Sequence, residues 1–421
     1  MSEHELCESI FQNTTVFKNS KFQVDLPLKV PLNEVNDVLG SSFDRAYYRL
    51  LNLEKKLQKN IHLLSDYDKF ITEYVDLGHG HYIDINSLDF ENNPLYFMPH
   101  HAVINEHSHS TRTRIVFDCS MQTDKKIALN DILLNGAPLQ RDLFDIMLLF
   151  RLGEYTFSTD IRRMFRCVNV NPMHTKLQNI LWRSNPNDPL KCIQLDTVTY
   201  GQKSSNYLAT RCLQELSTRY ETDFPLASYI LQNCTYVDDA CFSHSDLNVI
   251  IEARMQLCEL LGKASFYTHK WASNEPRILE GIADDKRQFD SLEFQRDNLY
   301  LKTLGLKLNM QDDCFIFSCP EPFDKANPTK KEILSYISKC YDPLGFVSPI
   351  IMKAKAFMQK IYSEKIGWNE VPSEPLRQEW ISFANKLSQM EPFTINRNLQ
   401  IPSNSAALQL VGFADACSTT G

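Results

Sequence analysis

The chain has 421 residues, 43% of them hydrophobic and 23% charged, with a net charge of −8 at pH 7. This composition is that of an ordinary soluble globular protein of two or three domains, and it excludes an intrinsically disordered chain. The apolar runs are shorter than the ~18 residues of a membrane span, and the polar start MSEHELCESI is unlike a secretion signal. We therefore expect an intracellular protein, cytoplasmic or nuclear, that is neither secreted nor membrane-bound.

The cysteine spacing and the net charge bear on three possible features: disulfides, a zinc site and nucleic-acid binding. The twelve cysteines are scattered singly without a CxxC pair, so we expect reduced thiols and no zinc site. A negative net charge is unusual for a protein that binds nucleic acid. Basic residues nevertheless cluster at Arg112 and Arg114, within residues 162–166 and at residues 330–331, which is compatible with a basic groove on an acidic body. The alternative for each cluster is a solvated surface.

The first half of the chain predicts a helical lead-in followed by strands. Residues 41–74 carry apolar positions at helical spacing. Between residues 96 and 118, the segments YFMPHHAVI and TRIVFD predict two strands of a hairpin-like unit. Residues 141–152 predict a helix that Gly153 ends, and the next segment, YTFSTD, predicts a strand whose last residue is Asp160.

The second half places two further acids at a turn between strands. A strand, CIQLDTVTY, precedes Gly201 and a helix through SSNYLATRCLQELSTRY, and the apolar run ASYILQNCTYV then leads as a strand to Asp238 and Asp239. Beyond them the pattern predicts helices and strands in alternation and without an internal repeat, which is typical of an α+β fold. The expected helices lie near 246–261, 348–365 and 375–389, the strands near 299–306 and 313–318, and subdomain joints near 327 and 370–376.

Asp160, Asp238 and Asp239 form a hard-oxygen site suited to magnesium if a sheet brings them together. Two such ions about 4 Å apart can activate a primer 3′-hydroxyl and stabilise the leaving pyrophosphate. An isolated pair of aspartates is more often a surface turn, because Asp bonds nearby backbone. Here the pair lies between two apolar runs, in TYVDDACF, where unpaired charge is costly, and this context favours metal binding.

Two of these segments, TYVDDACF and FSTDIRRMF, resemble the palm motifs of reverse transcriptases. Further blocks resemble one branch of these enzymes, the Bel/Pao-type long-terminal-repeat retrotransposons, in the same order along residues 96 to 350. The blocks are YFMPHHAVI, RTRIVFDCS, LNDILLNGAPLQ, DIRRMF, TVTYG, YVDDACF, HKWASN, LGLKLN and YDPLGFVSPI. The chain is thus similar to the reverse transcriptase region of a Bel/Pao retrotransposon polyprotein.

This resemblance implies an RNA-directed DNA polymerase with a right-hand fold, in which fingers and thumb flank an antiparallel palm sheet. It implies that Asp160, Asp238 and Asp239 hold two Mg²⁺ ions, for which Mn²⁺ is a possible substitute. The implied partners are an RNA or DNA template with a primer and deoxynucleoside triphosphates. Such an enzyme acts in a cytoplasmic virus-like particle or in the nucleus, and the sequence leaves its oligomeric state open.

The resemblance also assigns roles to five further residues. Phe165 matches the gate that excludes a ribose 2′-hydroxyl, and Arg114 matches the finger-strand residue that grips the triphosphate. Lys270 matches the lysine that donates a proton to the leaving pyrophosphate. Tyr200 and Gly201 belong to the turn that lines the nucleotide pocket, where a glycine permits close approach. Without the resemblance, surface charges and a core aromatic are the simpler interpretations.

The sequence departs from the family pattern at two positions. Asn206 follows Ser205 where the family has proline, which indicates an altered loop. Leu308 replaces an expected tryptophan, and we interpret this change as packing. Near the end, LQLVGFADACSTTG resembles the first strand of a ribonuclease H domain with Asp415 as its first acid, so we expect a polyprotein fragment or decayed copy without RNA-cleaving activity.

The expected organisation therefore has four parts. They are a partly helical lead-in over 1–80, fingers and palm over 81–310, a thumb- or connection-like helical region over 311–400, and a truncated start of a ribonuclease H-like domain over 401–421.

Two other functions remain as alternatives. A catalytically inactive relic, or a domesticated nucleic-acid-binding protein, keeps the fold without the activity; the truncation and Asn206 favour it. The survival of all three acids favours the enzyme. A viral-type RNA polymerase is disfavoured, because Phe165 as a gate rejects ribonucleotides.

Overall fold

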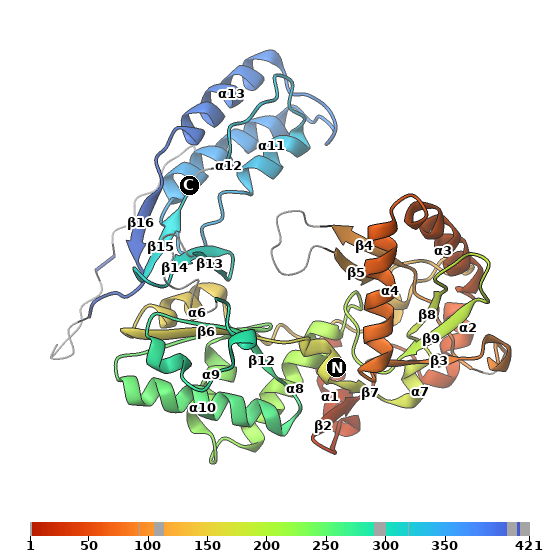
Figure 1. The fold of residues 1–421 in the computed structure, drawn as a ribbon. Coiled ribbons are helices and arrows are strands. Elements are labelled where there is room, and N and C mark those ends of the chain that lie inside the picture. Colours follow the sequence, from red (N-terminus) through yellow and green to blue (C-terminus); the bar gives the residue numbers. More distant parts are fainter. Residues whose placement is uncertain are drawn as a thin grey trace. The chain divides into compact units, whose positions relative to one another are not determined.

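The structure is a computed structural model, and it describes residues 2–91, 93–104, 113–289, 300–318, 320–401 and 411–412. Helices and strands are mixed throughout (Figure 1), which confirms the α+β class. The chain forms two compact units, each assembled from three separate stretches of sequence. Unit 1 contains residues 1–140, 161–232 and 256–267, and unit 2 contains residues 141–160, 233–255 and 268–421. The boundaries of fingers, palm and thumb stay predictions.

Unit 1 combines helices with three small sheets, whose strand orders are β1-β2-β7, β3-β9-β8 and β4-β5. Its helices are α1 (Glu3–Thr14), α2 (Val35–Leu39), α3 (Phe43–Leu57), α4 (Ile61–Asp76), α5 (Leu129–Ile132), α7 (Pro172–Thr175), α8 (Ser205–Arg219) and most of α9 (Pro225–Asn233). Its strands are β1 (Val16–Lys18), β2 (Lys21–Val24), β3 (Gly80–Ile83), β4 (His100–Ile104), β5 (Thr113–Phe117), β7 (Asn169–Val170), β8 (Asn179–Trp182) and β9 (Lys191–Leu195).

Unit 2 contains two four-stranded sheets, with strand orders β10-β11-β6-β12 and β13-β14-β15-β16. The strands are β6 (Tyr155–Ile161), β10 (Thr235–Tyr236), β11 (Asp239–His244), β12 (Thr268–Ser273), β13 (Tyr300–Thr303), β14 (Leu306–Asn309), β15 (Cys314–Phe317) and β16 (Phe393–Asn396). The helices are α6 (Leu143–Phe150), α11 (Lys330–Ile337), α12 (Ser348–Ser363) and α13 (Glu374–Ser388). Residues of α10 (Leu247–Lys263) belong to both units.

Three local differences separate the observed elements from the expected ones. The lead-in over 41–74 is two helices, because the chain turns after α3 and Asn60 caps the start of α4. Most of the apolar run before Asp238 is helix α9, so the strand that reaches the acids is the short β10. Helix α11 begins at a capping box of Thr329 and Glu332, inside a segment interpreted from sequence as a joint.

The amino-terminal helix is tied to α8 within unit 1. Phe11 packs edge-on against the ring of Tyr207, and Glu8 pairs with Arg211 at 3.1 Å. The Arg211 guanidinium also lies over the Phe11 ring. The lead-in is therefore anchored on the helix that follows the Gly201 turn.

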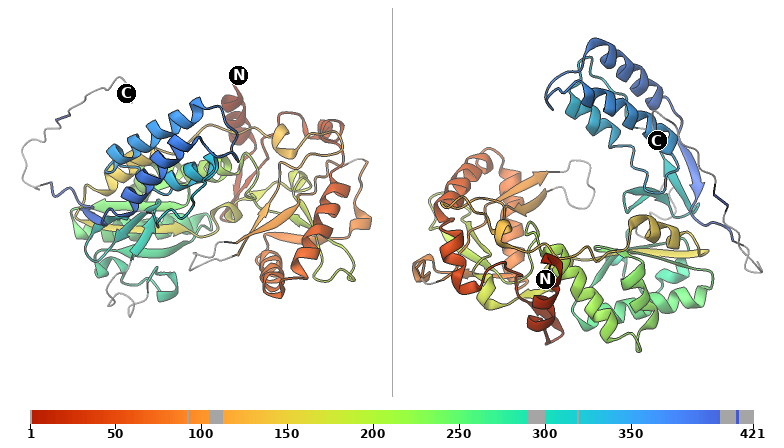
Figure 2. Two further views of the ribbon diagram at one scale, coloured as in Figure 1. Left: turned by 90° about the horizontal axis from the view of Figure 1, so that it is seen from above. Right: turned by 180° about the vertical axis from the view of Figure 1, so that it is seen from behind.

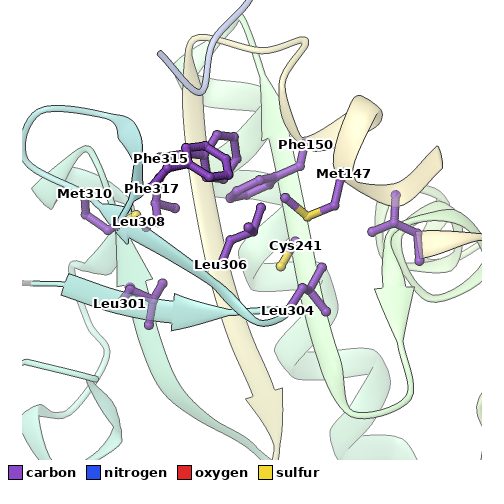
Figure 3. Close-up of a cluster of buried hydrophobic side chains, with 12 residues drawn as sticks. Met147, Phe150, Cys241, Leu301, Leu304, Leu306, Leu308, Met310, Phe315 and Phe317 are labelled. Atoms are coloured by element: carbon purple, nitrogen blue, oxygen red, sulfur yellow. The ribbon is translucent and has the colours of Figure 1, made fainter. Parts of the chain in front are cut away.

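The core of unit 2 lies between helix α6 and the two sheets (Figure 3). Met147 and Phe150 of α6 point toward side chains of β13, β14 and β15, and Cys241 of β11 joins the same cluster. Leu308 is fully buried there, which confirms the packing interpretation of that position. A second cluster, around Trp380, joins α11, α12 and α13, which run side by side in both views of Figure 2.

A buried arginine next to β16 forms hydrogen bonds with other parts of unit 2. Arg397 has 0% exposure, and its guanidinium donates two hydrogen bonds to the Asp313 carboxylate, at 2.6 and 2.8 Å. The same side chain donates to the backbone carbonyl of Phe150, the last residue of α6, and to those of Gly153 and Glu154 in the loop before β6. A cation at this end also complements the helix dipole. Arg397 thus satisfies one carbonyl that α6 leaves without a helical partner and two carbonyls of the following loop.

Candidate active site

The three predicted acids converge in one sheet of unit 2. Strands β6 and β11 run antiparallel, and their register places Asp160 directly opposite Asp239. Partner Cα atoms in such a pair lie about 5 Å apart. On the other side of β11, Tyr236 pairs with Asp239, which leaves Val237 and Asp238 as a two-residue hairpin loop. The structure therefore brings the separately predicted acids of two motifs to the same end of the two central strands, β6 and β11.

The hairpin loop places a β-branched residue in an unfavourable conformation. Val237 has a φ of 57°, and a positive φ at the first loop position is a requirement of tight hairpin turns that glycine usually meets. For valine this conformation is a genuine outlier, which costs on the order of 1–3 kcal/mol. Backbone strain is thus stored next to the two acids.

A lysine and a histidine of β12 lie close to the first acid. Lys270 Nζ lies 3.1 Å from Asp160 Oδ2, and His269 Nδ1 lies 3.8 Å from Asp160 Oδ1. Neighbouring residues of a regular strand point to opposite faces. Lys270 has a φ of 56°, which interrupts this alternation and lets both side chains turn toward Asp160. The family resemblance indicates Lys270 but not His269, although both belong to the block HKWASN.

The site carries more negative charge than the neighbouring lysine compensates. Burial raises the pKa of the Asp239 carboxyl to about 7, the charges of Asp238 and Asp160 add to this rise, and Lys270 opposes it. Asp160 Oδ1 is buried and has no hydrogen-bond partner within the described ranges. A buried, crowded set of carboxylates is costly unless a cation joins it.

The donor set fits a hard divalent cation by its chemistry, because carboxylate oxygens are the preferred ligands of Mg²⁺. As the side chains stand, no group of three or more His, Cys, Asp and Glu residues within the described part of the chain is arranged around an ion position. Lys270 instead donates a hydrogen bond from Nζ to one carboxylate oxygen of Asp160. The assignment of Asp160, Asp238 and Asp239 as metal ligands therefore stays a prediction.

Three of the four predicted nucleotide-binding residues line one cavity in unit 1. This cavity, of about 830 Å³, is lined by Arg114 of β5, by Phe165 and by Tyr200. It is completed by Asp66, Lys69, Phe70, Glu73, Thr113, Ile115, Val116, Arg163 and Arg166. Burial raises the pKa of the Tyr200 phenol to about 12, although the positive charge of Arg166 and a hydrogen bond from it act in the opposite direction. The cavity is therefore rich in cationic and aromatic side chains.

Gly201 is not part of that cavity wall, and its conformation has a different explanation. Its φ is 97°, and an added Cβ would lie 2.3 Å from the carbonyl oxygen of Phe117. Any side chain at this position would therefore collide with the end of β5. Helix α8 starts four residues later with Ser205, and Asn206 occupies its first turn without disrupting it. The role of Gly201 in nucleotide binding stays a prediction.

None of the helices in the described ranges has the length and apolar character needed to span a lipid bilayer.

The comparison with family models finds one match. A model described as Pao retrotransposon-like RNaseH-like domain matches residues 329–420. The match confirms the Pao retrotransposon resemblance for this part of the chain. It covers helices α11 to α13 and β16, which the sequence analysis assigned to a thumb or connection, and it includes the predicted start of ribonuclease H. Asp415 lies outside the described residues.

Among solved structures, the chain is similar to a foamy viral protease-reverse transcriptase (dRH) in complex with double-stranded DNA. The two share 15% sequence identity with a TM-score of 0.47, over 77% of this chain and 47% of the viral one. The chain thus spans about half the length of that viral protein. The search of curated proteins found no match.

Proposed function

We propose that the chain is the polymerase part of a retrotransposon reverse transcriptase, which adds deoxynucleotides to a primer 3′-hydroxyl on an RNA or DNA template. The observation that carries this proposal is the pairing of Asp160 with Asp239 across two strands, with Asp238 in the adjoining turn. A two-metal phosphoryl transfer uses carboxylates that lie close enough to share its ions, and this pairing supports that role. The retrotransposon match over residues 329–420 agrees with it.

The roles follow from what each side chain offers. Asp160, Asp238 and Asp239 would hold Mg²⁺ ions, which when bound supply a Lewis acid for the reacting oxygens. Lys270 carries a proton at Nζ beside Asp160 and is assigned to protonate the leaving pyrophosphate. In unit 1, the Arg114 guanidinium would bind phosphate oxygens, and Phe165 would lie against the sugar. The acids belong to unit 2 and the cavity belongs to unit 1.

Primer extension tests this proposal. Purified chain is incubated with a primed RNA template, deoxynucleotides and Mg²⁺, and the product is resolved by length. We expect extension by the wild type and a loss of at least 100-fold in Asp238→Asn, because removal of a metal-holding charge weakens transition-state stabilisation. Glu280→Gln, an exposed acid of unit 2, serves as the control and should extend normally. A folded wild-type chain that gives no extension would overturn the proposal.

A second candidate is a nucleic-acid-binding protein without catalysis. The observation that favours it is the contact between Lys270 and Asp160, which neutralises an acid that a metal would need. Tight binding of a primed template that is equal in wild type and Asp238→Asn, without extension by either, would support this candidate.

A further inference from the structure

The unit 1 cavity contains an arginine pair that the sequence motifs do not assign. Arg163 and Arg166 flank Phe165, and both line the cavity together with Arg114 and Lys69. Between them lies a carboxylate of helix α4: Glu73 Oε1 is 2.6 Å from Arg163 Nη2 and 3.7 Å from Arg166 Nη1. One negative charge thus faces two positive charges.

Arg166 is fixed in place as a buried cation. The residue is 9% exposed, and its guanidinium lies over the rings of Tyr74 and Phe70, at 4.4 and 5.1 Å from the ring centres. Within the described ranges its Nη1 atom has no hydrogen-bond partner. The Glu73 carboxylate, at 3.7 Å, is too far from Nη1 for a hydrogen bond. A buried guanidinium nitrogen without a hydrogen bond is costly, and an anion that accepts one there would remove the cost.

Arg163 is held toward the cavity by its backbone. Its φ is 53°, a left-handed conformation that is uncommon outside glycine, and it precedes the short helical turn Met164–Cys167 that carries Arg166. Burial lowers the pKa of Arg163, and repulsion from Arg162 and Arg166 acts in the same direction, while Glu73 opposes it. The local structure therefore concentrates positive charge at one wall of the cavity.

Glu73 is a replaceable partner for this charge. Its side chain is 47% exposed, whereas that of Arg166 is 10% exposed, so the carboxylate can turn into solvent while the arginine stays. The other acid of the cavity wall, Asp66, is already engaged by the hydroxyl of Thr113. Phosphate oxygens match the guanidinium geometry as well as a carboxylate does and carry more charge.

We propose that Arg163 and Arg166 form a binding site for the polyphosphate group of a nucleoside triphosphate, and that Glu73 occupies this site until the ligand displaces it. Glu73 acts as an internal competitor that weakens the binding of anions with too little charge to displace it. The identity of the ligand rests on the proposed polymerase function, whereas the anion site itself rests on the arginine pair.

Binding without metal or primer tests the site apart from catalysis. Calorimetric titration with deoxythymidine triphosphate and with inorganic tripolyphosphate is carried out in EDTA on the full chain. We expect Glu73→Gln to bind both ligands about tenfold more tightly than the wild type, a coupling of ordinary size between competing ligands. Arg163→Gln and Arg166→Met should each weaken binding of both ligands, and Arg166→Met should also cancel the gain in the double variant with Glu73→Gln.

The pair of Glu54 and Arg183 provides a matched control. It is a buried ion pair of unit 1 outside the cavity, with two contacts of 2.7 and 3.1 Å. Glu54→Gln should leave the affinity for tripolyphosphate unchanged. An equal gain in this control, or unchanged affinity in Glu73→Gln, would overturn the proposal. If Glu73→Gln does not fold, unchanged affinity in Arg163→Gln would overturn it instead.

Further outcomes separate the ligand and the function. Equal competition by an oligonucleotide without a triphosphate would assign the arginine pair to a nucleic-acid backbone and overturn the proposal. Tighter triphosphate binding by Glu73→Gln in a chain that does not extend primers would retain the anion site and remove the polymerase function. Primer extension by a chain in which Glu73→Gln leaves triphosphate affinity unchanged would retain the polymerase function and remove the proposed role of Glu73.

Discussion

The raised pKa of Asp239 couples the stability of unit 2 to pH. The folded-state pKa is about 7, against 3.8 for an unperturbed aspartate. The folded state therefore holds more protons than the unfolded state between these values, and the free energy of unfolding falls as pH rises from about 4 to about 7. The favourable contribution of protonation is complete below this window and lost above it.

Asp239→Asn should remove this dependence. In EDTA near pH 8 we expect the variant to be more stable than the wild type by on the order of 1–3 kcal/mol, after allowance for solvent screening. Below about pH 4 the two should be equally stable. Urea unfolding at several pH values measures the difference, with Glu280→Gln as an exposed control. A wild type whose stability is flat across the window would contradict the assigned pKa.

Phe165 is expected to determine whether the enzyme prefers deoxynucleotides to ribonucleotides. If it lies against the sugar of the bound nucleotide, Phe165→Val removes the bulk that excludes a 2′-hydroxyl. We expect the ratio of kcat/KM for deoxynucleotides over ribonucleotides to fall by at least tenfold, while deoxynucleotide incorporation is largely retained. Ile115→Val, elsewhere in the same cavity, should leave the ratio unchanged. An unchanged ratio in Phe165→Val would place the gate elsewhere.

At the scale of elements, β16 belongs to a sheet whose other strands precede the family match. The matched segment starts at residue 329, but β16 pairs with β15, and Arg397 binds Asp313. The segment 329–420 is therefore not closed on itself. Its strand β16 is part of the sheet β13-β14-β15-β16, which packs with α6, so we expect the matched region and this sheet to unfold together.

Arg397→Met measures the strength of this link. The change leaves Asp313 and three backbone carbonyls without their donor, and loss of one partner from a buried pair typically costs 3–5 kcal/mol, so we expect about 3 kcal/mol here. Arg277→Met, which removes an exposed pair with Glu275 in the same unit, should cost less than about 0.5 kcal/mol. Denaturant unfolding compares the two variants. Similar losses in both would show that Arg397 is replaceable.

At the scale of the whole chain, a matched pair of truncations locates the end of unit 2. A chain that stops after residue 391 lacks β16 and Arg397, which exposes the edge of β15. An open edge strand promotes aggregation, so we expect this form to be insoluble or to melt well below the full chain. A chain that stops after residue 401 keeps both features and should stay soluble and melt well above the shorter form. Equal behaviour of the two truncations would contradict the assigned role of β16.

The local sequence pattern predicted the strands and turns that carry the site residues better than it predicted the contacts between these residues. Apolar runs and their acids predicted a turn and a strand close to those observed. The turn is at Val237 and Asp238, Asp239 begins β11, and β6 ends at Ile161, one residue after Asp160. Their pairing across the sheet followed from the family resemblance and not from spacing. The helix α9 was interpreted as strand because a short apolar run fits either structure. No feature of the sequence predicted the left-handed backbone conformation of Lys270, which turns the His269 side chain toward Asp160.

The contacts within the unit 1 cavity could not be predicted from local sequence pattern either. Arg163 and Arg166 were recognised as a basic cluster, but their partner Glu73 lies about ninety positions earlier in the chain, in a helix predicted only as a lead-in. Such a contact depends on tertiary packing, which propensity and periodicity do not encode. The sequence also contained no sign that Gly201 lies against the backbone of Phe117, where an added Cβ would collide.

The interleaving of the two units has a consequence for synthesis on the ribosome. Unit 1 needs residues up to 267, and unit 2 needs residues from 141 through Arg397. At translation rates of about 5–20 residues per second, the first 267 residues take roughly 15–50 s to appear. During that time α1 waits for its α8 partner, and neither core is complete. The nascent chain therefore exposes apolar surface for much longer than a chain of consecutive domains, and we expect it to depend on chaperones during translation.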